Sequence, residues 1–221
     1  ITAIADGGRF IPLKSGFADE MLTGFAPIGG VVTGIVATVH GRTLTPSGAR
    51  KASGFISFCD NFMIPVVTLV DTDGVDISAD AENAAYAPEL ARLAAAYSAS
   101  TNTKVTAIVG KAYGAAYTLL GSKAVGADVV LATENAEISV MAPDAAVQFM
   151  YGDEIKTPEE RAEKKNEWMK NHACAAAAAS TGDIDDVVAP EELRARLISA
   201  VGMLWAKASG EASAKHSKLP F

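Results

Sequence analysis

The sequence predicts an α/β fold in which buried strands alternate with helices. Two short and almost wholly apolar runs, residues 64–71 and 105–109, have the pattern of strands buried on both faces. A glycine turn and then a stretch of helical character follow each run. A chain of 221 residues can bury one sizeable core, so we expect residues 1–221 to form a single domain.

The first half of the chain contains one complete unit of strand, helix and strand. Residues 32–40 are rich in β-formers and follow the tight turn at Gly29-Gly30, which predicts a strand. Thr45 and Pro46 then provide a signal for the start of a helix over residues 47–62. Apolar residues recur at helical spacing in that stretch, and the buried strand 64–71 comes directly after it.

The second half repeats this unit. A helix is expected over the alanine-rich residues 81–100, with Pro88 in its first turn or at a kink. Gly114 should begin another helix directly after the second buried strand. The remaining expected elements are a strand beginning at 127–131, helical stretches at 157–180 and 190–207, and a polar tail over 214–221.

Composition excludes several classes of function. The net charge is −7 and the basic residues are scattered, which argues against a nucleic-acid interface. No apolar run approaches the roughly 20 residues of a membrane-spanning helix. Cys59 and Cys174 form neither a disulfide framework nor a metal-binding spacing, so we expect a reducing, cytoplasmic location.

Two glycine turns are the main candidates for chemistry. One is Asp73-Gly74-Val75, and the other is the helix start at Gly114 within K-A-Y-G-A-A-Y-T-L-L-G-S-K, residues 111–123. Turns of this kind present free backbone N–H groups, and two together can form a hole for a developing oxyanion. The fingerprints of dinucleotide and phosphate loops are absent, so these turns are interpreted as backbone donors only.

Side chains that could act as nucleophile or base are scarce. His40, His172 and His216 lie far from any G-x-S-x-G elbow, and each is interpreted as structural or solvated. Asp71 ends a buried strand, where a carboxylate commonly bonds its own turn. The residues therefore favour chemistry that needs no side-chain base.

Ordered sequence blocks running through nearly the whole chain are similar to one family. They read G-F-A-P-I-G-G-V-V-T-G-I-V-A at 24–37, A-R-K-A-S-G-F-I-S-F-C-D-N-F-M-I-P-V-V-T-L-V-D-T at 49–72, K-A-Y-G-A-A-Y at 111–117, A-E-I-S-V-M-A-P-D-A-A at 136–146 and K-H-S-K-L-P-F at 215–221. The chain resembles the carboxyltransferase subunits of biotin-dependent acyl-CoA carboxylases, such as propionyl-CoA carboxylase β, and their relatives in sodium-pump decarboxylases. The resemblance implies a crotonase-like α/β domain with repeated β-β-α units, corresponding to the carboxyl-terminal half of that subunit.

The resemblance also implies a reaction and a site. This half of the family subunit holds biotin, which arrives as carboxybiotin on a carrier protein, and the other half holds the acyl-CoA. Carried over by motif, the hole for the biotin oxygen uses the N–H groups around Gly74, Val75, Ala115 and Ala116, with Gly114 allowing the tight turn. The implied partners are an acyl-CoA-binding amino-terminal domain or subunit, the carrier protein and further copies of the chain, and no metal is implied.

This chain departs from the family at residues beside the expected site. Asp73 replaces a proline, Ala115 replaces a glycine, and Thr38 stands where an asparagine is common. Thr118, which follows Tyr117 and belongs to the expected cofactor side, is neither the acidic nor the aliphatic residue usual there. We expect the Asp73 charge to oppose an anion and the Ala115 methyl to crowd a ligand.

Two other functions remain open from the sequence. In the first, the chain is a structural or carrier-docking module without chemistry of its own. In the second, it is a stand-alone crotonase-type hydratase or isomerase. The last reading requires an acid or base carboxylate near the second turn, for which Glu134 and Glu137 are the candidates.

Overall fold

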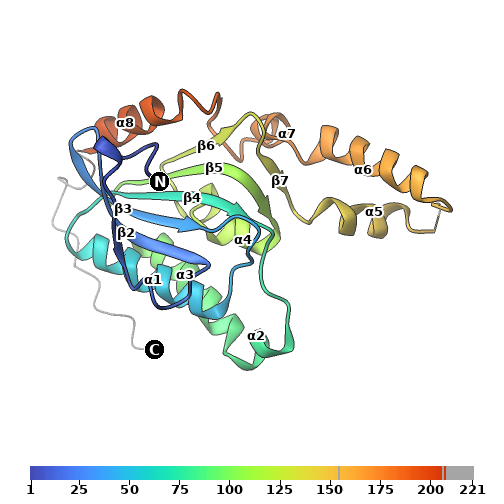
Figure 1. The fold of residues 1–221 in the computed structure, drawn as a ribbon, viewed down its shortest axis with the longest axis horizontal. Coiled ribbons are helices and arrows are strands. Elements are labelled where there is room, and N and C mark those ends of the chain that lie inside the picture. The colour runs from blue at the N-terminus through green and yellow to red at the C-terminus, as the bar shows by residue number, and fades with distance from the viewer. Residues whose placement is uncertain (154, 206, 208–221) are drawn as a thin grey trace.

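The computed structural model describes residues 1–153, 155–205 and 207, and its centre is an eight-stranded mixed sheet (Figure 1). The strand order is β1-β2-β3-β4-β5-β6-β8, and β7 pairs with β5 outside this order. The polar tail expected at 214–221 lies outside the described residues. The strands are β1 (Ile11–Leu13), β2 (Met21–Ile28), β3 (Val31–Thr38), β4 (Val66–Thr72), β5 (Lys104–Tyr113), β6 (Val129–Thr133), β7 (Glu137–Ser139) and β8 (Asp186–Val188).

The inner strands are parallel, as the continuous apolar runs predict. β3, β4, β5 and β6 run side by side in parallel, and one row across them consists of Ile35, Val67, Val105 and Val129. Such rows need helices on both faces, because both sides of each strand are apolar. Strand β2 was not expected from the sequence; it forms an antiparallel hairpin with β3 through the glycine pair at 29–30.

Helices cover both faces of the sheet (Figure 1). Helices α1 (Pro46–Asn61) and α3 (Tyr86–Ala99) pack on one face, and α8 (Leu193–Leu204) packs on the other. Helix α1 begins where the sequence predicts, since Thr45 Oγ1 accepts a hydrogen bond from Gly48 N at 3.0 Å and Pro46 occupies the first turn. Helix α4 (Gly114–Leu119) also begins at its predicted residue.

Three expected helices differ from the structure. The stretch 81–100 is divided into α2 (Ala79–Asn83) and α3, because Ala85 adopts a left-handed φ of 62° that ends the first helix. Pro88 lies in the first turn of α3, as expected. The stretch 157–180 is also divided, at residues 173–174, into α6 (Pro158–His172) and α7 (Ala175–Ser180). Residues 190–192 form a turn ahead of α8 instead of its first turn.

Helices α5 (Pro143–Tyr151) and α6 form an arm that extends away from the sheet (Figure 1). Helix α5 was not expected from the sequence. Helix α6 has no buried residue, and it begins with a capping box in which Thr157 and Glu160 satisfy each other's backbone N–H groups. Two short 3₁₀ turns, Asp6–Gly8 and Lys123–Val125, complete the described elements.

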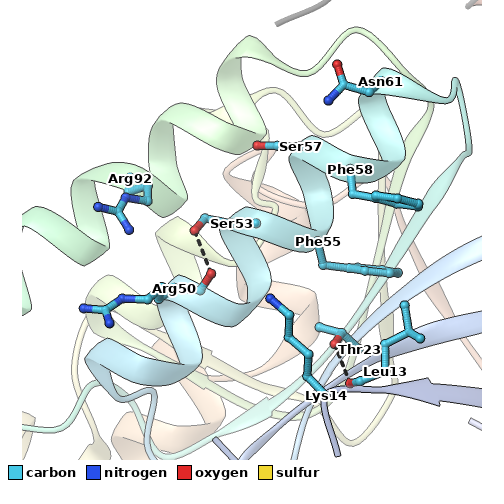
Figure 2. Close-up of a pocket in the computed structure, with 11 residues that line it drawn as sticks. Leu13, Lys14, Thr23, Arg50, Ser53, Phe55, Ser57, Phe58, Asn61 and Arg92 are labelled. Carbon is cyan, nitrogen blue, oxygen red and sulfur yellow. Dashed lines mark hydrogen bonds between the residues drawn. The ribbon is translucent and has the colours of Figure 1, made fainter. Parts of the chain in front are cut away.

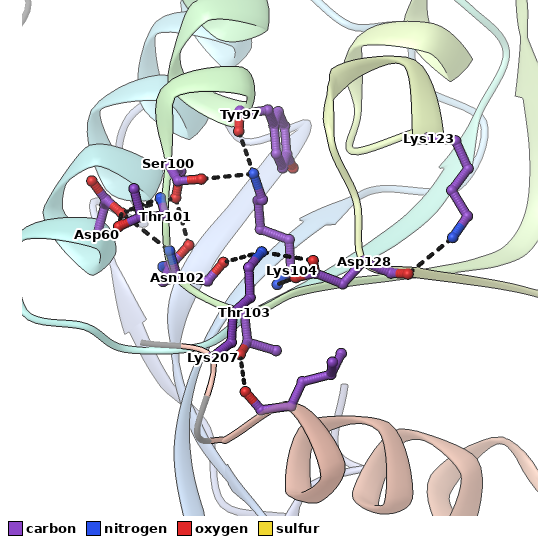
Figure 3. Close-up of polar contacts among 11 residues, drawn as sticks. Asp60, Tyr97, Ser100, Thr101, Asn102, Thr103, Lys104, Lys123, Asp128 and Lys207 are labelled. Carbon is purple, nitrogen blue, oxygen red and sulfur yellow. Dashed lines mark hydrogen bonds and ion pairs between the residues drawn. The ribbon is translucent and has the colours of Figure 1, made fainter. Parts of the chain in front are cut away.

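A buried polar network joins the amino ends of β5 and β6 (Figure 3). Asp60 Oδ1 accepts hydrogen bonds from the N–H groups of Thr101 and Asn102, at 2.6 and 3.3 Å. The Lys104 ammonium, which is almost fully buried, donates to the carbonyls of Tyr97 and Ser100 at 2.6 and 2.8 Å. Burial lowers the pKa of Lys104. This network lies at the opposite ends of the strands from the glycine turns, so it serves the fold.

Candidate functional site

The two glycine turns meet at the carboxyl edge of the sheet. They follow β4 and β5, which are neighbouring parallel strands, and Thr72 pairs with Ala112 just before them. A Cβ built on Gly74 would lie 3.7 Å from the carbonyl oxygen of Tyr113, the residue that precedes Gly114. The carboxyl edge of a parallel sheet is where α/β proteins bind ligands. The structure thus brings the two predicted turns together.

The first turn leaves one amide open. Gly74 is buried with φ 118°, its carbonyl accepts a hydrogen bond from Leu44 N at 2.8 Å, and its own N–H lies 3.4 Å from Thr72 Oγ1. Val75 is half-buried, and within the described part of the chain its N–H makes no hydrogen bond. Asp76 N donates to the Leu44 carbonyl at 2.9 Å, which holds the turn on its far side. Val75 therefore provides the available donor of this turn.

The second turn places one amide at the surface. Gly114 has φ 59°, a left-handed conformation that explains the glycine, and a Cβ there would meet the Val140 carbonyl oxygen only at an ordinary contact distance of 3.4 Å. No side chain caps α4, so its first amides have no partner within the helix. Ala115 is exposed, whereas Ala116 is fully buried. Of the two predicted donors, Ala115 is therefore the one that a ligand can reach.

Two of the residues expected to differ from the family pattern, Ala115 and Thr118, share a face of α4. Ala115 and Thr118 are three residues apart, which places them on neighbouring positions of one helix face, and both are exposed. The Thr118 carbonyl accepts a hydrogen bond from Ser122 Oγ at 2.7 Å.

The charge of Asp73 is compensated. Lys111 Nζ lies 2.9 Å from Asp73 Oδ1, across the ends of β5 and β4. The hydrogen bond to Asp73 raises the pKa of Lys111, which stays protonated. We expected Asp73 to oppose an anion at this site, and the ion pair reduces that repulsion.

A polar cavity of about 370 Å³ adjoins the turns. The Tyr113 hydroxyl donates a hydrogen bond to Glu137 inside it, and burial is the first cause that raises the pKa of Tyr113. Glu137 is thus in the cavity and already paired, while Glu134 is exposed in the turn after β6. The polar lining residues are Asp73, Lys111, Tyr113, Glu137, Asp144 and Lys165.

Sequence reasoning missed a His–Asp pair beside this edge. His40 Nδ1 lies 2.8 Å from Asp71 Oδ2, and Lys111 N–H donates to Asp71 Oδ1 at 3.0 Å. Asp71 fits because Gly110 has no side chain; a Cβ there would lie 2.3 Å from Asp71 Oδ1. The two members are 31 residues apart, and the one available signal was that each lies near the carboxyl end of a strand, Asp71 within β4 and His40 just after β3.

Metal-binding and membrane-spanning features are absent from the residues that the structure describes. In residues 1–153, 155–205 and 207 no group of three His, Cys, Asp or Glu side chains is arranged to hold a metal ion. No helix in those ranges is both long enough and apolar enough to cross a membrane.

Comparison with known proteins identifies the family. Residues 1–219 match the family described as carboxyl transferase domain. The chain is 40% identical to a putative propionyl-CoA carboxylase beta chain of Bacillus subtilis and 34% identical to the methylmalonyl-CoA carboxyltransferase 12S subunit of Propionibacterium freudenreichii subsp. shermanii. Each match covers 100% of this chain but only 45% and 43% of the relative, so the chain spans less than half of their lengths.

A solved structure agrees with these relatives. The transcarboxylase 12S structure described as a hexamer, with methylmalonyl-coenzyme A and methylmalonic acid bound, superimposes with a TM-score of 0.90 at 34% identity. The alignment covers 100% of this chain and 44% of that one. The expected crotonase-like α/β fold is therefore confirmed. The chain belongs to the carboxyl transferase domain family of propionyl-CoA carboxylase beta chains and methylmalonyl-CoA carboxyltransferases.

Proposed function

We propose that this chain supplies the biotin-side half of a site for carboxyl transfer between carboxybiotin, held by a carrier protein, and an acyl-CoA. One observation carries the proposal: the turns at Gly74 and Gly114 meet at the carboxyl edge of the sheet and leave the amides of Val75 and Ala115 without partners. Membership of the carboxyl transferase family supplies the class of reaction.

The backbone donors match the requirement of this reaction. Carboxybiotin supplies the carboxyl group, and its ureido oxygen is an acceptor that gains negative charge during transfer. The N–H groups of Val75 and Ala115 would donate to that oxygen, and each donor of an oxyanion hole typically contributes about 3 kcal/mol of transition-state stabilisation. Gly74 and Gly114 have no side chain to keep an acceptor away from the backbone.

The surrounding side chains support this role. Lys111 offsets the charge of Asp73, so the entrance to the turns is not left with an unpaired anion. Tyr113 remains protonated because its pKa is raised, and its hydroxyl donates a hydrogen bond to the Glu137 carboxylate. Among the described residues that line the cavity, the acidic side chains Asp73, Glu137 and Asp144 are each paired, with Lys111, Tyr113 and Lys165, which favours carboxyl transfer over hydration chemistry. The exposed Ala115–Thr118 face would limit the size of the bound group.

The proposal requires partners. Related proteins are named for propionyl-CoA and methylmalonyl-CoA, so we propose an acyl-CoA as the acceptor. A domain or subunit equivalent to the other half of those relatives would bind it, and the carrier protein and further copies of the chain would complete the assembly. A test of activity therefore has to supply the acyl-CoA-binding half.

The test is carboxyl transfer in the reconstituted system. Formation of carboxylated acyl-CoA from carboxybiotin is measured, or the reverse reaction with free biotin, for wild type, Val75→Pro and Val75→Ala. Proline removes the N–H donor and alanine retains it, so we expect kcat to fall on the order of 10²-fold for Val75→Pro and to change little for Val75→Ala. Equal rates for the two variants, with circular dichroism showing both folded, would contradict the proposal.

The same experiment separates the alternatives. Absence of both transfer and biotin binding in the wild type would favour a structural or carrier-docking module. Hydration of an enoyl-CoA that is lost in Glu137→Gln would favour a crotonase-type hydratase, since Glu137 is the carboxylate that lies in the cavity.

A further inference from the structure

We propose that Asp71 is a positioning residue for carboxyl transfer, because its side chain holds a bulge in β5 that brings the second glycine turn level with the first. The two turns concerned are those of the proposed function, so the inference rests on that function. It goes further by naming the residue that sets the relative position of the backbone donors.

Strands β4 and β5 change register just before the turns. Val70 pairs with Ile108. Thr72, two residues further along β4, pairs with Ala112, which is four residues further along β5. Strand β5 therefore has two more residues than β4 in this interval, and they form a bulge within residues 109–111. Bulges are frequent beside active sites, because they redirect the end of a strand.

The bulge brings the two glycines level with each other. Gly74 and Gly114 each lie two residues beyond the last pair of β4 and β5. In the register that the strands have before the bulge, Gly74 would be level with Ala112 instead. Since a parallel strand advances about 3.3 Å per residue, the second turn would then be displaced by about 7 Å. The amides of Val75 and Ala115 would no longer reach one oxygen atom.

The Asp71 carboxylate occupies the bulge. Its Oδ1 accepts a hydrogen bond from Lys111 N at 3.0 Å, which gives β5 an acceptor where the ladder to β4 is interrupted. Gly110 provides the space, since a Cβ there would lie 2.3 Å from the same oxygen. The Asp71 side chain is only 18% exposed, so a lost hydrogen bond is poorly replaced by water.

Contacts from the other side fix Asp71 itself. Thr38, the last residue of β3, accepts a hydrogen bond at Oγ1 from Asp71 N at 2.7 Å and donates to the Asp71 carbonyl at 3.0 Å. His40 Nδ1 lies 2.8 Å from Oδ2, the carboxylate oxygen that does not contact β5. Asp71 is thus held from β3 and in turn holds β5, so one residue links three neighbouring strands at the edge that carries the turns.

The bulge also directs Lys111 to the first turn. Lys111 N is held by Asp71, and Lys111 Nζ lies 2.9 Å from Asp73 Oδ1. One residue of β5 therefore contacts both the end of β4 and the turn that follows it. Loss of the Asp71 acceptor should disturb the relative position of the turns, and not stability alone.

Carboxyl transfer in the reconstituted system tests this role. The values of kcat and of KM for the acyl-CoA are measured for wild type, Asp71→Ala and Asp71→Asn. We expect kcat to fall about 10²-fold in Asp71→Ala with KM little changed, because misplacing reacting groups by about an ångström has an effect of that size. Asp71→Asn should retain most of kcat, since its amide oxygen still accepts from Lys111 N.

Two other contacts provide matched controls. Asp128 Oδ2 accepts a hydrogen bond from Lys104 N at 2.8 Å at the opposite end of β5 (Figure 3), so Asp128→Ala removes the same kind of contact away from the turns. Thr23 Oγ1 donates to the Leu13 carbonyl of the neighbouring strand at 3.1 Å (Figure 2), so Thr23→Val is the control for Thr38→Val. We expect Thr38→Val to lower kcat and both controls to retain it.

Three kinetic outcomes overturn the assignment. One is an unchanged kcat in Asp71→Ala. Another is an equal loss of kcat in Asp128→Ala, which would show that any weakening of β5 has the same effect. The third is an Asp71→Asn variant as slow as Asp71→Ala, because the requirement would then be the carboxylate charge and not the acceptor for Lys111 N.

Strand register is also measured without the reaction. Amide hydrogen exchange should show Lys111 N–H protected in wild type, and backbone nuclear Overhauser effects should connect Thr72 with Ala112. In Asp71→Ala we expect faster exchange at Lys111 and loss of the Thr72–Ala112 contact. If these changes occur but wild type transfers no carboxyl group, the proposed function fails and the role of Asp71 in the register stands. If wild type is active and the register of Asp71→Ala is unchanged, the role of Asp71 is refuted.

Discussion

Substituting Gly110 by alanine should destabilise the protein through Asp71. Gly110 has no left-handed φ, so alanine brings no backbone strain, and the new Cβ would lie 2.3 Å from Asp71 Oδ1 and 2.4 Å from its Cγ. The carboxylate has to move because such a contact is shorter than any van der Waals distance. Its hydrogen bond from Lys111 N, at 3.0 Å, is then lost.

The expected cost follows from these contacts. A hydrogen bond to a charged, mostly buried carboxylate contributes about 2 kcal/mol. The His40 contact to the same carboxylate adds little, since the imidazole is 78% exposed. We expect Gly110→Ala to lower the free energy of unfolding by about 2 kcal/mol, which lowers Tm by roughly 4–8 °C in a chain of this size.

Urea unfolding followed by circular dichroism measures this change. Gly202→Ala is the matched control, because Gly202 lies in α8 with open space around it and should become more stable by up to about 1 kcal/mol. In an Asp71→Ala background, Gly110→Ala should cost almost nothing, since the clashing group is gone. An equal cost in both backgrounds would refute the steric explanation.

Three further predictions concern stability and the site. Asp60→Ala should lower the free energy of unfolding by about 3 kcal/mol, because the N–H groups of Thr101 and Asn102 lose their buried acceptor. Urea titration measures this free energy, and a loss below about 1 kcal/mol would contradict the prediction. Burial raises the pKa of Cys59 from 9.0 to about 12, so the thiol contributes its full stability below pH 9 and loses it at higher pH, by up to about 1.4 kcal/mol per pH unit. The free energy of unfolding, measured from pH 8 to 10.5, should therefore fall more steeply in wild type than in Cys59→Ala. Parallel curves for the two proteins would exclude the effect. Gly114→Ala should cost about 1–2 kcal/mol of stability and reduce carboxyl transfer, because φ 59° disfavours a side chain, and unchanged stability would show that the turn adapts.

Local patterns predicted much of the fold. The apolar runs at β4 and β5 predicted buried parallel strands, because a strand covered on both faces needs no polar side chain. Thr45 with Pro46 located the start of α1, since capping depends on neighbouring residues alone. The breaks at Ala85 and Cys174 were not predicted, because alanine-rich segments favour a continuous helix until packing requires a turn.

The candidate site was also predicted only in part from the sequence. The glycines at 74 and 114 were visible in the sequence, because positive φ angles restrict residue type locally. Which amides a ligand can reach was decided by tertiary packing, which buries Ala116 and exposes Ala115.

The sequence by itself therefore determined the fold class and the two turns, because propensity, burial pattern and turn chemistry act over a few residues. The family was indicated separately, by the resemblance of ordered sequence blocks. Tertiary structure alone decided the pairing of Lys111 with Asp73 and of His40 with Asp71. These contacts join residues more than thirty positions apart, at the ends of strands that meet only when the sheet forms. Electrostatic balance at the site depends on those distances, and no local pattern encodes them.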